Sequence, residues 1–164
     1  MSAPLRPSPP PLILTCGEPA GIGPELAPRA LAAGVPFVWM GDPRHLPAGT
    51  NWAEVSTPAD PPPPGALPVL RHDFPAPTTP GRPDPANAQA VADVIARAAA
   101  MAMAGQAGGI CTLPINKQAL KQGAGFAFPG HTEYLADLAG GADVVMMLAS
   151  TSVTPSKAAI GTAP

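Results

Sequence analysis

The segment that constrains the fold most is residues 12–40, where two short apolar runs flank a glycine-rich loop and a helical stretch. The runs at 12–15 (LILT) and 37–40 (FVWM) have the length of buried strands. Between them, Pro24 suits the first turn of a helix, and Gly34 is typical of a helix end. A strand, a helix and a second strand in this order predict a parallel pair, and therefore an α/β fold.

Further alternation of strand and helix patterns extends this unit to a mostly parallel sheet flanked by helices. A long helix is predicted from Asp84-Pro85, a cap residue followed by a proline, to Gly105. Residues 143–149 form a continuous apolar run, as expected of a central strand that is covered on both faces. The other predicted elements are strands at 68–70 and 109–112 and helices at 24–33, 116–122 and 132–139, the last capped by Thr132.

Proline is the unusual component of the composition. It accounts for 26 of the 164 residues, about three times its usual share. However, 46% of the residues are hydrophobic and only 12% are charged, whereas a disordered chain shows the reverse. We therefore divide the chain into a Pro-rich leader (1–10), a folded portion (11–150) and a divergent tail (151–164). The Pro-rich stretch 56–68 is interpreted as an excursion within the folded portion; separation of two domains is the less favoured alternative.

Charge and apolar patterning exclude several classes of partner. The net charge is −2 and the nine Lys and Arg residues form no cluster, so we expect no nucleic-acid-binding surface. No apolar run approaches the roughly 20 residues of a membrane span, and the N-terminus lacks the features of a signal peptide. We expect a cytoplasmic protein without membrane contact, in which Cys16 and Cys111 are buried free thiols.

The first candidate site is the glycine loop, residues 17–25 (GEPAGIGPE), with Glu18, Gly21 and Gly23. Between a strand and a helix, glycine lets backbone N–H groups approach a phosphate or a carboxylate. The loop has no lysine for a Walker motif, and Leu26 stands where a dinucleotide-binding fingerprint needs its third glycine. Local chemistry leaves a tight structural turn and a ligand loop equally open, and Glu18 is more typical of a turn partner than of an acid or base.

Two further candidates follow later in the chain. Thr112 ends a predicted strand, where open α/β sheets bind ligands, and Lys117 opens the next helix. A cation at that helix end is unfavourable unless it has an anionic partner, although a solvated lysine is the simple alternative. His131 follows Gly130 at a helix start and can present its ring to a ligand. The alternative is that His131 and Thr132 serve only in capping and packing.

Together, these segments resemble the N-terminal half of 4-hydroxythreonine-4-phosphate dehydrogenase. The resemblance covers about residues 12–150 and is weakest across 45–80. The motifs that carry it, in order along the chain, are GEPAGIGPE at 17–25, TLPINK at 112–117, PGHTE at 129–133 and VVMMLA at 144–149.

This resemblance implies an enzyme that uses NAD or NADP to oxidise the hydroxyl group of 4-phosphooxy-L-threonine, a small phosphorylated hydroxy-amino acid. The resulting β-keto acid loses carbon dioxide to give 3-amino-2-oxopropyl phosphate, on the route to pyridoxal phosphate (vitamin B6). The implied fold is isocitrate/isopropylmalate dehydrogenase-like, in a homodimer whose active sites use both subunits. A divalent metal (Zn, Mg or Co), held by three His, is implied as a Lewis acid.

By the same resemblance, His131 and Thr132 match the substrate-binding pair of the family. The motifs also make five residues candidates for lining the cleft: Glu18, Gly21, Gly23, Thr112 and Lys117.

The metal ligands of the family have no counterpart in this sequence. The chain contains only His45, His72 and His131, and none of them matches a ligand position. We interpret His45 and His72 as ordinary surface residues. We therefore expect a truncated family member that is inactive alone; the alternatives are a non-catalytic remnant and a related four-carbon phospho-acid dehydrogenase.

Overall fold

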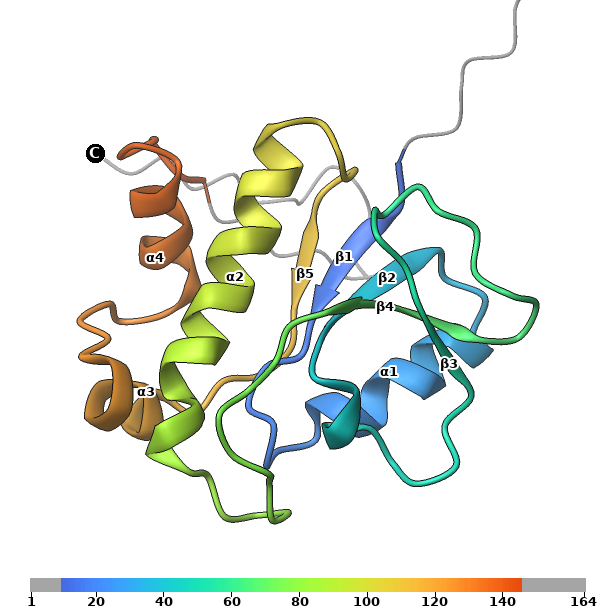
Figure 1. Cartoon of the computed structure of the whole chain (residues 1–164). Coiled ribbons are helices and arrows are strands. Elements are labelled where there is room, and N and C mark those ends of the chain that lie inside the picture. The colour runs from blue at the N-terminus through green and yellow to red at the C-terminus, as the bar shows by residue number, and fades with distance from the viewer. Residues whose placement is uncertain (1–9, 146–164) are drawn as a thin grey trace, which may run out of the picture.

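The computed structural model describes residues 10–145 of the 164-residue chain and shows a five-stranded sheet flanked by helices (Figure 1). The strands are β1 (Leu12–Thr15), β2 (Phe37–Gly41), β3 (Trp52–Glu54), β4 (Leu67–Arg71) and β5 (Ile110–Thr112). The helices are α1 (Gly23–Ala32), α2 (Ala88–Met103), α3 (Lys117–Ala124) and α4 (His131–Leu138), with 3₁₀ turns η1 (Pro43–His45) and η2 (Pro85–Asn87). All pairings between these strands are parallel, which confirms the predicted parallel α/β sheet.

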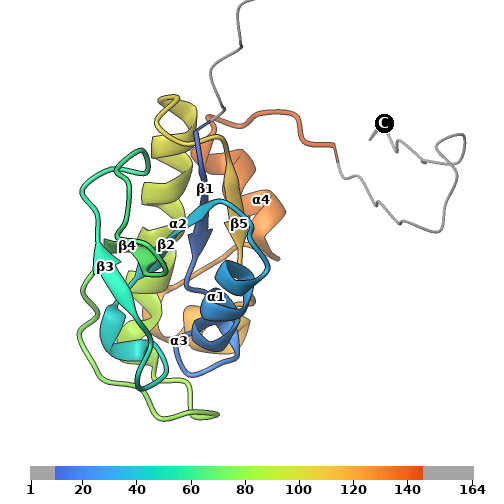
Figure 2. The same cartoon turned by 90° about the vertical axis from the view of Figure 1, so that its right-hand side faces the viewer.

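The order of the strands across the sheet is β3-β4-β2-β1-β5. The chain builds β2, β3 and β4 on one side of β1 and then crosses through α2 to β5 on the other side. Because crossover connections between parallel strands are right-handed, the two directions place α1 and α2 on opposite faces of the sheet. Figures 1 and 2 show this arrangement, with α3 and α4 on the side of α2. The carboxyl ends of β1 and β5 thus form the switch point at which open α/β sheets bind ligands.

The hydrophobic core joins the strands to α2. Strand β2 is buried along its whole length, and the side chains of Trp39 and Ile13 have no exposed surface. Helix α2 contributes Val91, Ile95 and Ala98 to the same cluster, and its many alanines allow close packing. Within residues 10–145, no helix has the length and apolar character that are needed to cross a membrane.

The Pro-rich stretch lies between two strands that pair directly with each other. Strands β3 and β4 are hydrogen-bonded neighbours, so the intervening residues leave the sheet and return to it. Asp60 orders part of this loop, because its carboxylate accepts hydrogen bonds from the backbone N–H groups of Ser56 and Thr57 and from the Thr57 hydroxyl. The three-residue strand β3 was not predicted, since its sequence lacks an apolar run.

The helix starts agree only partly with the sequence prediction. Asp84 acts as a cap, but of the 3₁₀ turn η2: its Oδ1 accepts from the backbone N–H of Ala86 at 2.9 Å. The long helix α2 itself begins later than predicted, at Ala88, with Asn87 as its N-cap residue. Helix α4, however, begins at His131 after an extended Gly130, which is the N-cap residue. The predicted capping role of Thr132 is therefore wrong, because Thr132 already lies inside the first turn.

The apolar run at 143–149 does not form a strand where the structure describes it. Residues 143–145 have no strand conformation, and Val144 and Val145 are 46% and 61% exposed. Residues 146–149 lie outside the described residues. The prediction of a buried central strand is wrong for 143–145, because such a strand needs hydrogen-bonded neighbours and apolar sequence alone does not supply them.

The two cysteines differ in environment, although the sequence predicted that both would be buried. Cys16 is buried, and burial raises the pKa of its thiol to about 12, so it stays protonated. Cys111 is exposed, which contradicts the prediction. In the sheet that residues 10–145 form, its strand, β5, lies at the edge, and such a strand leaves part of its surface uncovered.

Candidate functional site

The glycine loop leaves the carboxyl end of β1 beside the segment that leaves β5. Thr15 and Thr112 are register partners, so both loops start from neighbouring points of the sheet. The loops are in direct contact, because the backbone N–H of Glu18 donates to the carbonyl oxygen of Pro114 at 2.8 Å. The structure thus brings the first two predicted motifs together at the switch point of the sheet.

Close packing requires two glycines at this junction. Gly17 has a φ of +66°, and a Cβ there would lie 2.5 Å from the carbonyl oxygen of Pro114. A Cβ on Gly23, the first residue of α1, would overlap the carbonyl oxygen of Cys16. These contacts support the tight-turn interpretation for Gly17 and Gly23.

Glu18 is buried inside the loop and stabilises its turn. Its residue surface is only 8% exposed, and its Oε1 accepts from the backbone N–H of Ala20 at 3.0 Å. Burial raises the pKa of this carboxyl, the hydrogen bond from Ala20 opposes that effect, and the charge of Asp84 adds to it. The geometry fits a turn partner better than an acid or base that faces a ligand.

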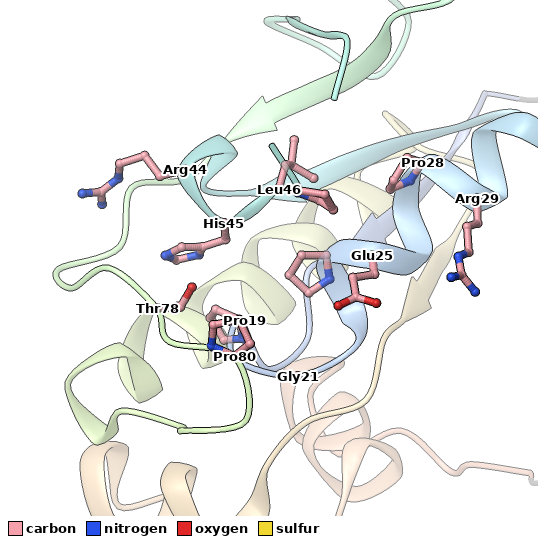
Figure 3. Close-up of a pocket in the computed structure, with 12 residues that line it drawn as sticks. Pro19, Gly21, Glu25, Pro28, Arg29, Arg44, His45, Leu46, Thr78 and Pro80 are labelled. Atoms are coloured by element: carbon pink, nitrogen blue, oxygen red, sulfur yellow. The ribbon is translucent and has the colours of Figure 1, made fainter. Parts of the chain in front are cut away.

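A cavity of about 560 Å³ opens on the outer side of the glycine loop, between α1 and the segment around η1 (Figure 3). Five prolines contribute to its wall, and Glu25, Arg29 and His45 are among its polar lining residues. In Figure 3, His45 lies on the side of Thr78, across from Glu25 on α1. Of the predicted site residues, only Gly21 lines this cavity.

His45 is buried, so its interpretation as a surface residue is wrong. It is 8% exposed, its ring packs edge-on against Phe74, and its Nε2 lies 3.4 Å from the carbonyl oxygen of Ala76. Burial lowers its pKa, an effect that the charge of Asp42 opposes. His45 ends the turn η1, which Asp42 caps and which also holds Arg44, the ion-pair partner of Asp42. His72 is only half-buried.

Lys117 and His131, from the second and third predicted motifs, lie close together. Asn116 caps α3 by accepting from the backbone N–H of Ala119 at 3.0 Å, which places Lys117 in the first turn. The Lys117 Nζ would lie 3.9 Å from a Cβ built on Gly130, the residue before His131. Burial, and then the positive charge of Lys117, lower the pKa of His131.

The His131 ring is poised for a further hydrogen bond. Its Nε2 is buried and has no hydrogen-bond partner among the described residues. Thr132 follows it in the first turn of α4, which has no side-chain cap. An imidazole, a hydroxyl and a nearby ammonium are suited to bind a polar, anionic molecule.

An aromatic cluster that was not predicted packs around α4, the helix that begins with His131. The rings of Phe126, Phe128 and Tyr134 lie with centroids 5.0–5.3 Å apart. The Tyr134 hydroxyl donates to the carbonyl oxygen of Ala92 at 3.2 Å and ties α4 to α2. The gathering of three aromatic residues within nine positions, in a chain with only 4% aromatics, was the available signal.

The comparison with known proteins shows the family to which this chain belongs. Residues 35–159 match the family described as pyridoxal phosphate biosynthetic protein PdxA. This chain belongs to the PdxA family. It is 74% identical over 145 residues to the 4-hydroxythreonine-4-phosphate dehydrogenase of Paracoccus denitrificans, which covers 88% of this chain and 45% of that protein. It is 54% identical over 156 residues to the enzyme of the same name from Roseobacter denitrificans, with 91% and 48% covered.

Solved structures agree with this membership of the PdxA family. The chain superposes on 4-hydroxythreonine-4-phosphate dehydrogenase from Klebsiella pneumoniae with a TM-score of 0.76 and 30% identity, over 85% of this chain and 47% of that one. The corresponding enzyme from Burkholderia phymatum gives a TM-score of 0.75 at 27% identity, over 87% and 47%. The chain spans about half the length of the curated relatives that it matches.

The described part of this PdxA-family chain does not assemble a metal centre. Between residues 10 and 145, no three His, Cys, Asp or Glu side chains come together. His45 belongs to η1 and His131 to α4, while His72 directly follows β4. These residues do not fit a metal site built from three His.

Proposed function

We propose that this chain provides the N-terminal half of an NAD- or NADP-dependent enzyme that oxidises 4-phosphooxy-L-threonine and releases carbon dioxide. The product is 3-amino-2-oxopropyl phosphate, on the route to pyridoxal phosphate. The observation that carries this proposal is the identity of 74% to a relative named 4-hydroxythreonine-4-phosphate dehydrogenase. The site geometry supports it, because the Lys117 ammonium lies next to Gly130, which directly precedes His131 and Thr132, and its charge acts on the His131 ring.

Six of the seven predicted residues take a defined part in this function, whereas Glu18 stabilises the turn of its own loop. His131 and Thr132 hydrogen-bond the polar groups of the substrate, and Lys117 supplies positive charge next to them. Gly23 and Thr112 keep the ends of β1 and β5 in their relative positions, and Gly21 lines the neighbouring cavity.

The metal would depend on ligands outside residues 10–145. A divalent ion (Zn, Mg or Co) would polarise the substrate oxygens when bound, but the described residues do not provide its ligands. We also propose that the complete enzyme has the isocitrate/isopropylmalate dehydrogenase-like fold, acts as a homodimer in the cytoplasm, and binds neither nucleic acid nor membrane. The alternatives are a non-catalytic role and a related four-carbon phospho-acid as substrate.

A chimera tests the function directly. Residues 10–145 of this chain would replace the matching part of the Paracoccus denitrificans relative, and NAD or NADP reduction would be measured with 4-phosphooxy-L-threonine. We expect an active chimera in which His131→Ala lowers kcat/KM roughly 10- to 100-fold, as for loss of a hydrogen bond to a charged substrate. His72→Gln, a matched control on a half-buried His away from the site, should leave activity unchanged. A folded but inactive chimera would refute the proposal.

The isolated chain provides the complementary experiment. Without a metal site in its described residues, we expect no reduction of NAD or NADP at any concentration of added Zn²⁺, Mg²⁺ or Co²⁺. Turnover that disappears in His131→Ala would show instead that the chain is catalytically sufficient.

A further inference from the structure

The tips of a cationic and an anionic side chain both lie next to Gly130. A Cβ built on Gly130 would lie 3.5 Å from the Glu133 Oε2 and 3.9 Å from the Lys117 Nζ. Both side chains are exposed, and among the described residues neither takes part in a salt bridge. Two opposite charges therefore approach the same point from α3 and α4 without neutralising each other directly.

The backbone does not require glycine at position 130. Gly130 has a φ of −170° and a ψ of −166°, an extended conformation that any residue adopts. This contrasts with Gly17, whose φ is positive, and with Gly23, where a Cβ would overlap backbone. What glycine provides at 130 is open space between the ammonium of Lys117 and the carboxylate of Glu133.

The two charges have different relations to their helices. Glu133 lies in the first turn of α4, where the helix dipole favours a negative charge. Lys117 lies in the first turn of α3, where the dipole disfavours a positive charge. The lysine gains nothing from its own helix, so the partner that would stabilise its charge is an anion from solution.

We propose that Lys117 and Glu133 form a site for the zwitterionic head of an α-amino acid, with the ligand carboxylate at Lys117 and its ammonium at Glu133. This inference rests on the proposed function, because it takes His131 and Thr132 as the residues that bind the rest of the substrate. Glu133 is then a specificity-determining residue. It distinguishes an amino acid from an otherwise identical hydroxy acid, which has no ammonium to pair with a carboxylate.

Two matched ligands test the proposal on the full-length chain. One is 4-phosphooxy-L-threonine, and the other is the same four-carbon phospho-acid with a hydroxyl group in place of the amine. We expect the unmodified chain to bind the amine roughly fivefold more tightly, as for an exposed ion pair. Glu133→Gln, which keeps the side-chain shape, should remove this preference by weakening only the amine. Lys117→Met should weaken both ligands to a similar extent.

The outcomes separate this inference from the proposed function. If Glu133→Gln changes the two affinities equally, or changes neither, the zwitterion site is refuted while His131 and Thr132 remain binding residues. A preference of the unmodified chain for the hydroxy acid would also refute it and would favour the alternative substrate. If the unmodified chain binds neither ligand in an NMR titration, both the zwitterion site and the substrate-binding role of His131 and Thr132 in this chain are refuted.

Discussion

The glycine-loop side and the His131 side of the site are built by opposite means. On the first side, Cys16, Glu18 and Gly23 are buried, and the loop contacts its neighbour through backbone atoms. On the second side, α4 has no fully buried residue, and the contacts with Lys117 and Glu133 involve side-chain tips. The first region is closely packed around its glycines, whereas the second leaves the side chains of Lys117 and Glu133 exposed.

This difference indicates a division of labour within the site. Residues at and next to the glycine loop connect the ends of the paired strands β1 and β5, and burial limits their reactivity, as the pKa of about 12 for the Cys16 thiol illustrates. Lys117, His131 and Glu133 keep charge or hydrogen-bonding capacity that the described fold does not use. Ligand chemistry is therefore expected on the second side and structural rigidity on the first.

The largest expected difference between the two sides is in the stability lost when one glycine on each side is replaced by alanine. Gly23→Ala places a methyl group on the carbonyl oxygen of Cys16, and we expect a loss of roughly 3 kcal/mol in the free energy of unfolding. Gly130→Ala meets only ordinary contacts in an extended backbone, and we expect a loss below about 1 kcal/mol. Urea unfolding followed by circular dichroism measures both values.

For ligand binding the order of the two effects should be the opposite, with the larger effect in Gly130→Ala. Gly130→Ala keeps the fold but fills the space between Lys117 and Glu133, so we expect it to weaken binding of 4-phosphooxy-L-threonine. Equal loss of stability in Gly23→Ala and Gly130→Ala would contradict the contrast between a packed and an open side.

Local sequence patterns were sufficient for the first side but not for the second. The apolar runs and the Gly-Pro junction predict β1, the loop and α1, because these elements depend on neighbours within a few residues. The proximity of Lys117 to His131 depends instead on the length of α3 and on the path of the loop that follows it. The resemblance to a known family indicated these residues, and spacing alone left their simple alternatives open.

The residues whose burial or strand position was wrongly predicted all depend on contacts with distant parts of the chain. His45 is buried by Phe74 and Ala76, some 30 positions away, which no local pattern reveals. Cys111 sits in an apolar run that resembles a central strand, but β5 is an edge strand of the sheet described for residues 10–145. Val144 continues an equally apolar run and has no strand partner in the described structure. In each case the sequence indicates hydrophobicity but not the position of the segment in the sheet.

The next prediction, of intermediate size, concerns the Tyr134 hydrogen bond that ties α4 to α2 on the His131 side of the site. Tyr134→Phe keeps the aromatic cluster with Phe126 and Phe128 but removes the hydroxyl that donates to Ala92. We expect a loss of about 1 kcal/mol, the usual net value of one hydrogen bond. Hydrogen exchange should accelerate in α4 and remain unchanged in α1, on the opposite face of the sheet. A uniform acceleration in both helices would show that α4 is not the more weakly anchored region.

The smallest expected effect concerns the protonation of His131. Its pKa lies below the ordinary value of 6.5 because of burial and, secondarily, the charge of Lys117. The unfolded chain therefore binds more protons than the folded one, so this His lowers the free energy of unfolding as the pH falls below about 6.5 and through the folded pKa. Lys117→Met removes the secondary cause, and we expect the pKa of His131 to rise toward its ordinary value.

Lys121→Met is the matched control, because it removes a positive charge from the same helix at a position that does not influence His131. An NMR titration of the His131 ring compares the two variants with the unmodified chain. The pKa should rise in Lys117→Met only, and acid destabilisation should become weaker in the same variant. An equal rise in both variants would mean that His131 responds to the net charge of α3. Lys117 would then have no specific place beside the His131 ring, and the open side would lose the contact that links its two helices.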